Sequence, residues 1–84
     1  MALKQRESPN IAIDGAKVRR ARQRASLTQS QLAERADIGQ SYVSSIEDGS
    51  RRRVSPPVYG RLCAALHLAD HDALIADPAD SSTP

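Results

Sequence analysis

Apolar residues recur at helical spacing near the start of the chain. Val18, Ala21 and Ala25 fall at positions i, i+3 and i+7, which places them on one face of a helix. Asp14 precedes this segment and can accept hydrogen bonds from the unpaired N–H groups of a first helical turn. The pattern therefore predicts a first helix that ends near Ser26.

Two further helices are predicted, separated by a break of three residues. Thr28 is a good N-cap for a helix over residues 29–36, and Asp37-Ile38-Gly39 then interrupts the pattern. A third helix is predicted from Gln40 to about Asp48. The inward-facing residues of these two helices are Leu32, Ala33, Ala36, Val43 and Ile46.

The rest of the chain predicts two more helices. Ser55-Pro56-Pro57 opens a fourth helix, because proline is tolerated in a first turn, and a last short helix is predicted from Asp70 to Ala76. Their apolar residues are Val58, Leu62, Ala65, Leu66, Leu74 and Ile75. We therefore expect an all-α domain of five helices over residues 11–76, with a flexible N-terminal arm at 1–10 and a disordered, Pro-rich tail at 77–84.

The composition agrees with a single small helical domain. The chain has 84 residues and a mass of 9.1 kDa, and it contains no Trp or Phe, so its core must be built from Leu, Ile, Val and Ala. Its apolar stretches are far shorter than the roughly 20 residues that cross a bilayer. A single cysteine, Cys63, excludes an intrachain disulfide. We expect a soluble cytoplasmic protein that does not associate with membranes.

The charges are unevenly distributed although the formal net charge is only +2. Up to Arg61 there are twelve Lys or Arg and six acidic residues, whereas the remainder has four aspartates and no cation. Ten of the cations are arginines, most of them in two clusters at residues 19–24 and 51–53. Because the planar fork of arginine suits phosphate, this half of the chain favours a polyanionic partner. A solvated charged face would explain either cluster taken alone.

The two helices around the three-residue break have a spacing that favours nucleic-acid binding. Such a break makes helices cross at a steep angle, and the second helix then projects toward a major groove about 12 Å wide. Ala33 is small enough to allow close crossing, and Ile38 fills the turn. Val43 and Ile46 of the second helix are expected to pack against the first helix. The sequence therefore predicts a helix-turn-helix over residues 29–48.

Over about residues 14–75 the chain resembles the lambda-repressor and Cro-like (XRE) helix-turn-helix regulators. The resemblance rests on Val-Arg-Arg-Ala-Arg at 18–22, Leu-Thr-Gln-Ser-Gln-Leu-Ala at 27–33, Ile-Gly-Gln-Ser-Tyr-Val-Ser-Ser-Ile-Glu-Asp-Gly at 38–49 and Leu-Cys-Ala-Ala-Leu at 62–66. Relatives usually have a left-handed glycine at the position of Asp37, and aspartate adopts that conformation more readily than most residues. The resemblance implies a lambda-repressor-like DNA-binding domain with double-stranded DNA as its partner.

The resemblance also implies which residues read the bases. Gln40 matches the first base-reading position of the family's recognition helix, where glutamine can bond adenine N6 and N7 together. Ser41, Ser44 and Ser45 share this outward surface and are expected to bond bases, phosphates or waters. Solubility alone is the other explanation for four small polar residues, although Glu or Lys would serve it better in a helix.

Five residues are implied to contact phosphate. Gln29 opens the second helix and resembles the family's phosphate clamp, a role that is compatible with simple capping. Arg51, Arg52 and Arg53 follow the recognition helix and are expected along the DNA backbone, with one of them reaching a minor groove as an alternative. Tyr42 matches a frequent tyrosine of the family, for which phosphate contact and packing are equal alternatives.

Arg22 and Glu47 match positions that pair between the first and third helices in relatives. An arginine fork on a carboxylate would fix how the recognition helix sits, so this pair is expected to be structural. Lys4 and Arg6 would allow the N-terminal arm to wrap a duplex, and an ordinary tail is the alternative.

No pattern in the sequence supports catalysis or metal binding. Cys63, His67 and His71 are spaced i, i+4 and i+8, but Leu68-Ala69-Asp70 is predicted to break the helix between them. The sequence contains no Gly-x-Ser-x-Gly elbow, no His-Glu-x-x-His and no phosphate-cradling glycine-rich loop. We therefore predict a protein that is not an enzyme and needs no metal or cofactor.

These observations predict a sequence-specific transcriptional regulator, more readily a repressor than an activator. A single recognition helix makes few base contacts, so we expect a homodimer on a palindromic operator whose half-sites lie about 34 Å apart. Leu68, Leu74 and Ile75 are candidates for the dimer interface, or they close the monomer core. An antitoxin or adaptor that uses the same fold to bind a protein partner is the alternative.

Overall fold

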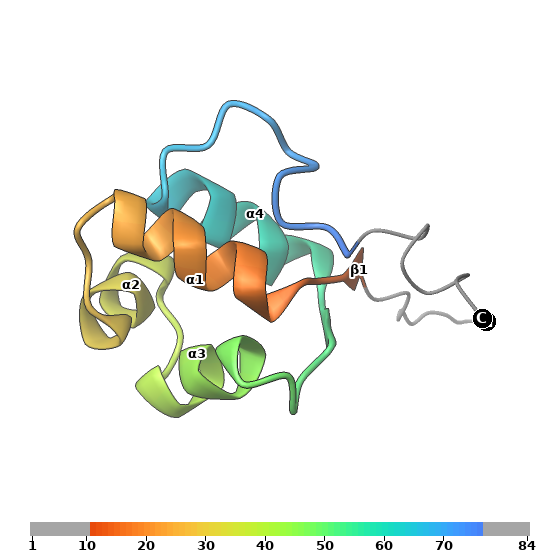
Figure 1. Ribbon diagram of the computed structural model, residues 1–84, viewed down its shortest axis with the longest axis horizontal. Coiled ribbons are helices and arrows are strands. Elements are labelled where there is room, and N and C mark those ends of the chain that lie inside the picture. Colours follow the sequence, from red (N-terminus) through yellow and green to blue (C-terminus); the bar gives the residue numbers. More distant parts are fainter. Residues whose placement is uncertain (1–10, 77–84) are drawn as a thin grey trace, which may run out of the picture.

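The computed structural model describes residues 11–76 of the chain. The expectations for the arm at 1–10, with Lys4 and Arg6, and for the tail at 77–84 lie outside the described residues. The elements are, in chain order, β1 (Ile11–Ala12), α1 (Gly15–Arg24), α2 (Gln29–Ala36), α3 (Gln40–Glu47), β2 (Arg53–Val54) and α4 (Pro56–Ala65) (Figure 1).

The helices enclose one core. α2 packs against both α3 and α4, and α1 packs against α3. The largest fully buried side chains are Val18, Leu32, Val43, Ile46, Val54, Leu62, Cys63 and Leu74. In Figure 1, α3 lies at the lower edge of the molecule and the segment that follows α4 lies at the opposite, upper edge. No helix among residues 11–76 is long and apolar enough to span a membrane.

Side chains cap the first two helices as the sequence predicts. The Asp14 carboxylate accepts hydrogen bonds from the backbone N–H groups of Ala16 and Lys17. The Thr28 hydroxyl accepts from the Gln31 N–H, and the Gln31 side chain accepts in return from the Thr28 N–H. This reciprocal capping box fixes where α2 begins.

Three helices end with a non-glycine residue in the left-handed conformation. These residues are Ser26 (φ 60°), Asp37 (φ 59°) and His67 (φ 56°). In each case the next residue is apolar and donates its N–H to the carbonyl five residues earlier, over 2.9–3.1 Å. The left-handed conformation expected at Asp37 is therefore confirmed, and it forms the turn of the helix-turn-helix.

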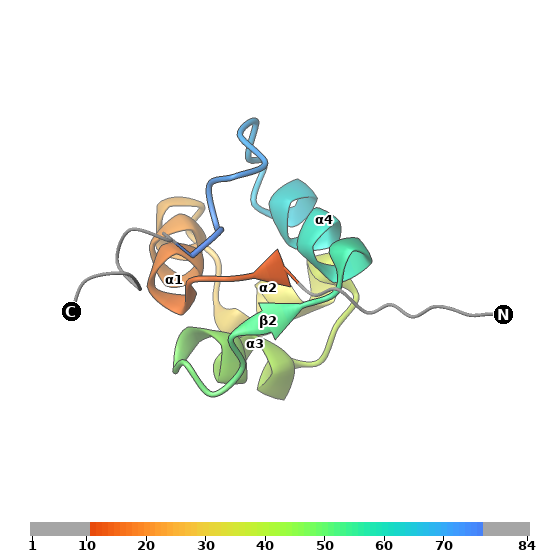
Figure 2. The ribbon, with the colours of Figure 1, turned by 90° about the vertical axis from the view of Figure 1, so that its right-hand side faces the viewer.

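A small two-stranded antiparallel sheet is present where only helices and loops are expected. β1 and β2 are antiparallel, with Ile11 opposite Val54 and Ala12 opposite Arg53 (Figure 2). The Ile13 N–H donates to the Arg52 carbonyl at 2.9 Å, which continues the pairing. The purely helical expectation is wrong here, because strands of two residues carry too little alternation to be read from a sequence.

The fifth helix predicted at residues 70–76 is not formed. This segment consists of turns and ends in an isolated bridge between Ile75 and Ile13. Besides two local turn bonds, its backbone groups bond to distant partners: the Leu74 carbonyl accepts from the Asp14 N–H at 2.8 Å. The Leu74 N–H donates to the Tyr59 hydroxyl at 3.3 Å. Tertiary contacts thus replace the local bonds of a helix, and the prediction of a fifth helix is wrong.

Tyr59 anchors this last segment to α4. Its side chain is buried, and its hydroxyl donates to the His71 carbonyl while accepting from Leu74. Burial raises the pKa of the Tyr59 hydroxyl to about 12, so it stays protonated and keeps donating at physiological pH.

Candidate nucleic-acid interface

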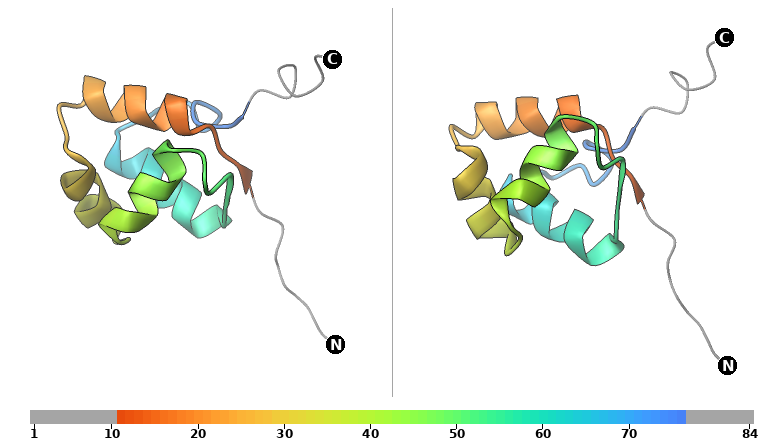
Figure 3. Two further views of the ribbon diagram at one scale, coloured as in Figure 1. Left: turned by 60° about the horizontal axis from the view of Figure 1, so that its bottom comes forward. Right: turned by 90° about the horizontal axis from the view of Figure 1, so that it is seen from below.

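The outer side of α3 lies on the surface of the molecule. Val43 and Ile46 face inward and are fully buried, whereas Gln40 and Ser41 are exposed. In Figure 3 the domain is turned to bring its lower edge forward, and α3 then lies in front of the other helices. The helix therefore presents its polar side outward, as expected for a recognition helix.

The predicted base readers share one shallow hollow with the start of α2. Its volume is about 380 Å³, and its lining residues are Gln29, Gln40, Ser41, Ser44, Ser45 and Asp48. The structure therefore brings Gln29, a predicted phosphate contact, beside the four predicted base readers. Asp48 also belongs to this surface, and sequence reasoning had not placed it there.

One of the serines has its hydroxyl hydrogen already engaged. Ser45 Oγ donates to the Tyr42 carbonyl at 2.7 Å, whereas no bond within residues 11–76 is formed by the hydroxyls of Ser41 and Ser44. Ser45 can therefore offer only lone pairs to a ligand in this conformation, and the other two serines can both donate and accept.

The loop after α3 gathers its arginines around a second hollow. This hollow measures about 570 Å³ and is lined by Ser45, Ser50, Arg51, Arg52 and Arg53. The loop is tied to α3, because the Arg51 N–H donates to the Ser45 carbonyl at 2.9 Å. Three exposed cations thus border the C-terminal end of the recognition helix.

Tyr42 positions one of these cations. The Arg51 guanidinium carbon lies 4.3 Å from the centroid of the Tyr42 ring, which is a cation–π distance. The Tyr42 side chain is also partly buried and packs against the core. Its hydroxyl forms no hydrogen bond among the described residues, which leaves it able to meet a ligand.

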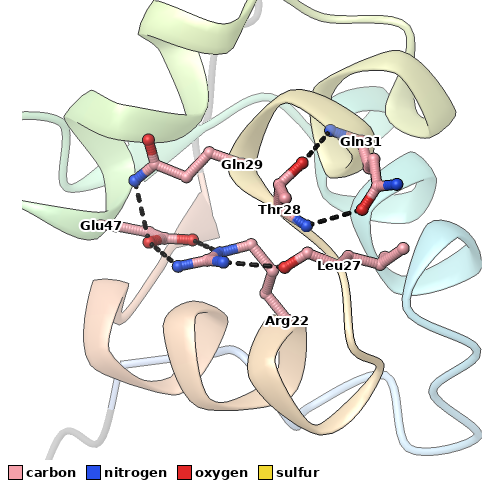
Figure 4. Close-up of polar contacts among 6 residues, drawn as sticks. All are labelled: Arg22, Leu27, Thr28, Gln29, Gln31 and Glu47. Carbon is pink, nitrogen blue, oxygen red and sulfur yellow. Dashed lines mark hydrogen bonds and ion pairs between the residues drawn. The ribbon is translucent and has the colours of Figure 1, made fainter.

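Arg22 and Glu47 meet in a bidentate ion pair between α1 and α3 (Figure 4). Arg22 Nε donates to Glu47 Oε2 at 2.7 Å, and Arg22 Nη2 donates to Glu47 Oε1 at 3.0 Å. The side chains are 14% and 5% exposed, so water screens the pair poorly. The bond to Glu47 raises the pKa of Arg22 above its ordinary value, because the carboxylate stabilises the charged guanidinium.

Glu47 also holds the residue that opens α2. Gln29 Nε2 donates to Glu47 Oε1 at 3.1 Å, and Arg22 Nη1 donates to the Leu27 carbonyl at 2.8 Å just before α2 (Figure 4). One buried carboxylate therefore joins side chains of three helices, α1, α2 and α3. It orients the Gln29 amide while leaving that amide a second N–H for a ligand.

Gly15 permits a close approach that sequence reasoning missed. A Cβ atom added there would lie 2.1 Å from the Ile46 carbonyl oxygen and 3.0 Å from that of Glu47. The start of α1 therefore abuts the end of α3, and any larger residue would push the recognition helix away. The sequence offered one signal, a glycine directly after a helix cap.

Two other cations have places that the sequence did not indicate. Arg19 lines a hollow of about 250 Å³ with Gln29, Ser44 and the Arg22–Glu47 pair, so it belongs to the same surface as α3. Its only signal was its position one turn before Arg22. Arg61 Nε donates to the Ala36 carbonyl at 2.9 Å and thus caps the end of α2.

The Cys63, His67 and His71 spacing does not lie on one helix. Cys63 is buried in α4, and burial raises the pKa of its thiol. His67 and His71 are exposed in the turns beyond the end of α4. Within residues 11–76 no group of three or more His, Cys, Asp or Glu is arranged to hold a metal ion.

The apolar residues near the C-terminal end divide into two groups. Leu74 is 1% exposed and belongs to the core of the monomer. Leu68 and Ile75 are half-buried and pack against the edge of that core. For Leu74 the structure therefore supports core closure rather than a place in a dimer interface.

Solved regulators share this arrangement of helices. The restriction-modification controller protein C.AhdI from Aeromonas hydrophila has a TM-score of 0.67 and 31% identity, over 73% of this chain and 89% of its own. SinR, the master regulator for biofilm formation, solved in complex with DNA, has a TM-score of 0.66 and 27% identity, over 70% of this chain and 95% of its own. A SinR–SinI complex gives a TM-score of 0.70 and 25% identity, over 82% of this chain and 66% of the matched chain.

The sequence comparison agrees with the structural one. No curated protein sequence matches the chain. The family model for the helix-turn-helix domain matches residues 15–75, which include the four helices found in the described part of the chain. C.AhdI and SinR are XRE-type regulators, so the resemblance noted in the sequence is confirmed. The chain belongs to the helix-turn-helix domain family of DNA-binding transcription regulators.

Proposed function

We propose that this protein is a sequence-specific, double-stranded DNA-binding transcriptional regulator that inserts α3 into the major groove. The observation that supports this most directly is the uncovered polar side of α3, bordered by Arg51, Arg52 and Arg53. A polar helix face alone would be an ordinary solvated surface. With three exposed arginines beside it, this face combines side chains that can bond base edges with cations that can contact phosphates. Recognition of a duplex needs both.

In this proposal the N-terminal end of α3 reads the bases. Gln40 is exposed at the first position of the helix, where its amide can bond adenine N6 and N7 together. Ser41 and Ser44 add hydroxyls that donate or accept, and Ser45 adds an acceptor only because its hydrogen bonds the Tyr42 carbonyl.

Phosphate contacts flank these readers on both sides. Gln29 offers its second amide N–H at the start of α2, where the helix dipole favours an anion. Arg19 stands beside Gln29, and the Arg51–Arg53 loop stands at the other end of α3 with the Tyr42 hydroxyl. Each cation that neutralises a phosphate releases counterions, so binding depends steeply on salt.

We further propose that the protein is a cytoplasmic repressor that binds as a homodimer to two inverted half-sites. A monomer presents one recognition helix, and two copies separated by about one helical turn, roughly 34 Å, would double the base contacts. Leu68 and Ile75 are the remaining apolar candidates for the contact between copies, because Leu74 is in the core.

Selection of bound duplexes from a random pool tests this function. We expect enrichment of a palindrome, and analytical ultracentrifugation with the enriched duplex should show two protein chains per site. Failure to enrich any sequence would contradict sequence-specific binding. One chain per enriched site would contradict the dimer only.

Gln40→Ala should weaken binding to the enriched duplex by about 1–3 kcal/mol and binding to random duplex much less, because a base contact carries sequence information and a phosphate contact does not. Fluorescence anisotropy titrations with both duplexes measure the two losses. Gln23→Ala, which truncates an exposed glutamine of α1, is the matched control. Equal losses on the two duplexes would remove Gln40 from base reading.

A second candidate function has support from one comparison. A structural neighbour, SinR, was solved in complex with a protein, SinI, so a protein that contains this fold also has a protein partner. We therefore keep an antitoxin or adaptor as the alternative. A stoichiometric complex with a second protein, found by native mass spectrometry of the endogenous protein and combined with no duplex enrichment, would favour it.

A further inference from the structure

Asp48 places a negative charge on the proposed DNA-binding surface. It is the C-cap of α3 and continues the outward stripe of that helix at the spacing of Gln40, Ser44 and Ser45. It is exposed, and it lines the hollow shared by the base readers and also the neighbouring hollow that contains Arg19. A fixed anion at this point is unexpected on a surface that has to approach a polyanion.

The carboxylate is held in place by the loop that it precedes. Asp48 Oδ1 accepts from the Ser50 N–H at 2.8 Å and from Ser50 Oγ at 2.6 Å. These bonds lower the pKa of Asp48 below its ordinary value, so the group remains charged throughout the physiological range. They also use only Oδ1, which leaves Oδ2 facing the surroundings.

The position of Asp48 along α3 determines what its charge would meet. The N-terminal end of a recognition helix approaches the base edges. Asp48 lies eight residues beyond Gln40, which is about 12 Å along a helix. There it is bonded to Ser50, the residue just before Arg51–Arg53, and these cations are proposed to follow the backbone, so the nearest groups of a duplex would be phosphates.

We propose that Asp48 is a specificity-determining residue, which acts by repelling phosphates from the C-terminal end of α3. This inference rests on the proposed function. Docking that inserts the N-terminal end of α3 is compatible with the carboxylate, because Gln40 then reaches the bases and the long arginine side chains still reach phosphates while the shorter Asp48 side chain stays farther from them. Docking that lays the whole length of α3 along the backbone brings Asp48 itself against the phosphates.

The repulsion therefore lowers mainly the affinity of sequence-independent binding. Non-specific complexes are held by phosphate contacts, and the three arginines favour them on any duplex. At about 7 Å in water, one carboxylate–phosphate repulsion lowers an affinity about threefold. Asp48 thus raises the ratio of specific to non-specific affinity without touching a base.

Asp48→Asn distinguishes the effect of this charge from the effect of the turn that Asp48 forms with Ser50. The asparagine oxygen still accepts from Ser50, so the loop is retained while the charge is lost. We expect affinity for random duplex to rise about threefold, with a salt dependence steeper by up to about one unit, and affinity for the enriched duplex to change less. Titrations of both duplexes between about 50 and 200 mM salt measure this.

Two control variants isolate the cause. Glu34→Gln removes an exposed carboxylate of α2 that lies outside both hollows, and it should leave the ratio of affinities unchanged. Ser50→Ala keeps the Asp48 charge but removes one bond of the turn, and it should not raise binding to random duplex.

Three results would overturn the proposal. Asp48→Asn indistinguishable from Glu34→Gln would show that the charge does not face a duplex. An equal gain on both duplexes would remove discrimination from its role. A loss confined to the enriched duplex would mean that Asp48 accepts a hydrogen bond from a base, such as the cytosine amino group. These three results apply only when the wild-type protein enriches a sequence. If the wild type enriches none, the proposed function is overturned instead.

Discussion

Replacing Glu47 with alanine should lower the free energy of unfolding by about 2–4 kcal/mol. The substitution leaves the Arg22 guanidinium, which is 14% exposed, without the carboxylate that neutralises it. It also removes the acceptor of the Gln29 amide, so all three helices joined by this side chain lose a contact. Chemical denaturation followed by circular dichroism measures the loss.

A double-mutant cycle distinguishes the ion pair from simple truncation. Arg22→Ala strands the Glu47 carboxylate, whereas the double variant removes both charges together, so its loss should be smaller than the sum by 1 kcal/mol or more, about the coupling found for contacting residues. Glu34→Ala truncates an exposed glutamate of α2 and should change stability by less than about 0.5 kcal/mol. Strictly additive losses, or a Glu47→Ala curve that overlays the wild type, would show that the pair does not stabilise the fold.

The helices could be predicted from the sequence because their signals are local. Asp14 and Thr28 cap α1 and α2 from positions directly before them, and the apolar spacing within each helix is visible over two or three turns. The turn at Asp37 was also predictable, since aspartate tolerates the left-handed conformation that a short break between helices requires. Each of these features is decided within about a dozen residues.

The remaining parts of the fold are decided by residues far apart in the chain. Segment 70–76 has apolar residues at helical positions, yet Leu74 bonds to Asp14 and to Tyr59. The β1–β2 sheet pairs residues about 40 positions apart in sequence. Neither of two paired segments carries a sequence pattern that identifies the other segment. Tertiary pairing therefore overrides local propensity in a way that the sequence does not reveal.

The candidate site also contains some residues whose roles follow from local sequence and others whose roles depend on distant parts of the chain. Gln40 and the Arg51–Arg53 loop follow from matching a known motif, because their roles depend on position within one short segment. Gly15 affects the position of α3, and Arg19 joins the surface around it, only because α1 packs against α3. Helix packing, rather than any motif, sets which α1 side chains reach the surface of α3.

Replacing Arg51, Arg52 and Arg53 together with alanine should flatten the salt dependence of DNA binding. Each backbone contact contributes about 0.9 to the slope of log K against log salt, so three contacts account for up to about 2.7 units. The loss should be similar on enriched and random duplexes, because phosphates carry no sequence information. Anisotropy titrations at several salt concentrations give the slopes.

The same change of charge placed elsewhere is the necessary control, since lowering the net charge alone weakens attraction to DNA. Arg20, Arg24 and Arg35 are exposed, and Arg20 and Arg24 line a hollow with Leu68 and Leu74 that contains no residue of α3. Their replacement by alanine should change the slope much less, because none of them lines the hollows around α3 and only cations that contact phosphates displace condensed counterions. Equal slopes for the two triple variants would show that long-range charge, rather than direct contact by the loop after α3, accounts for the attraction.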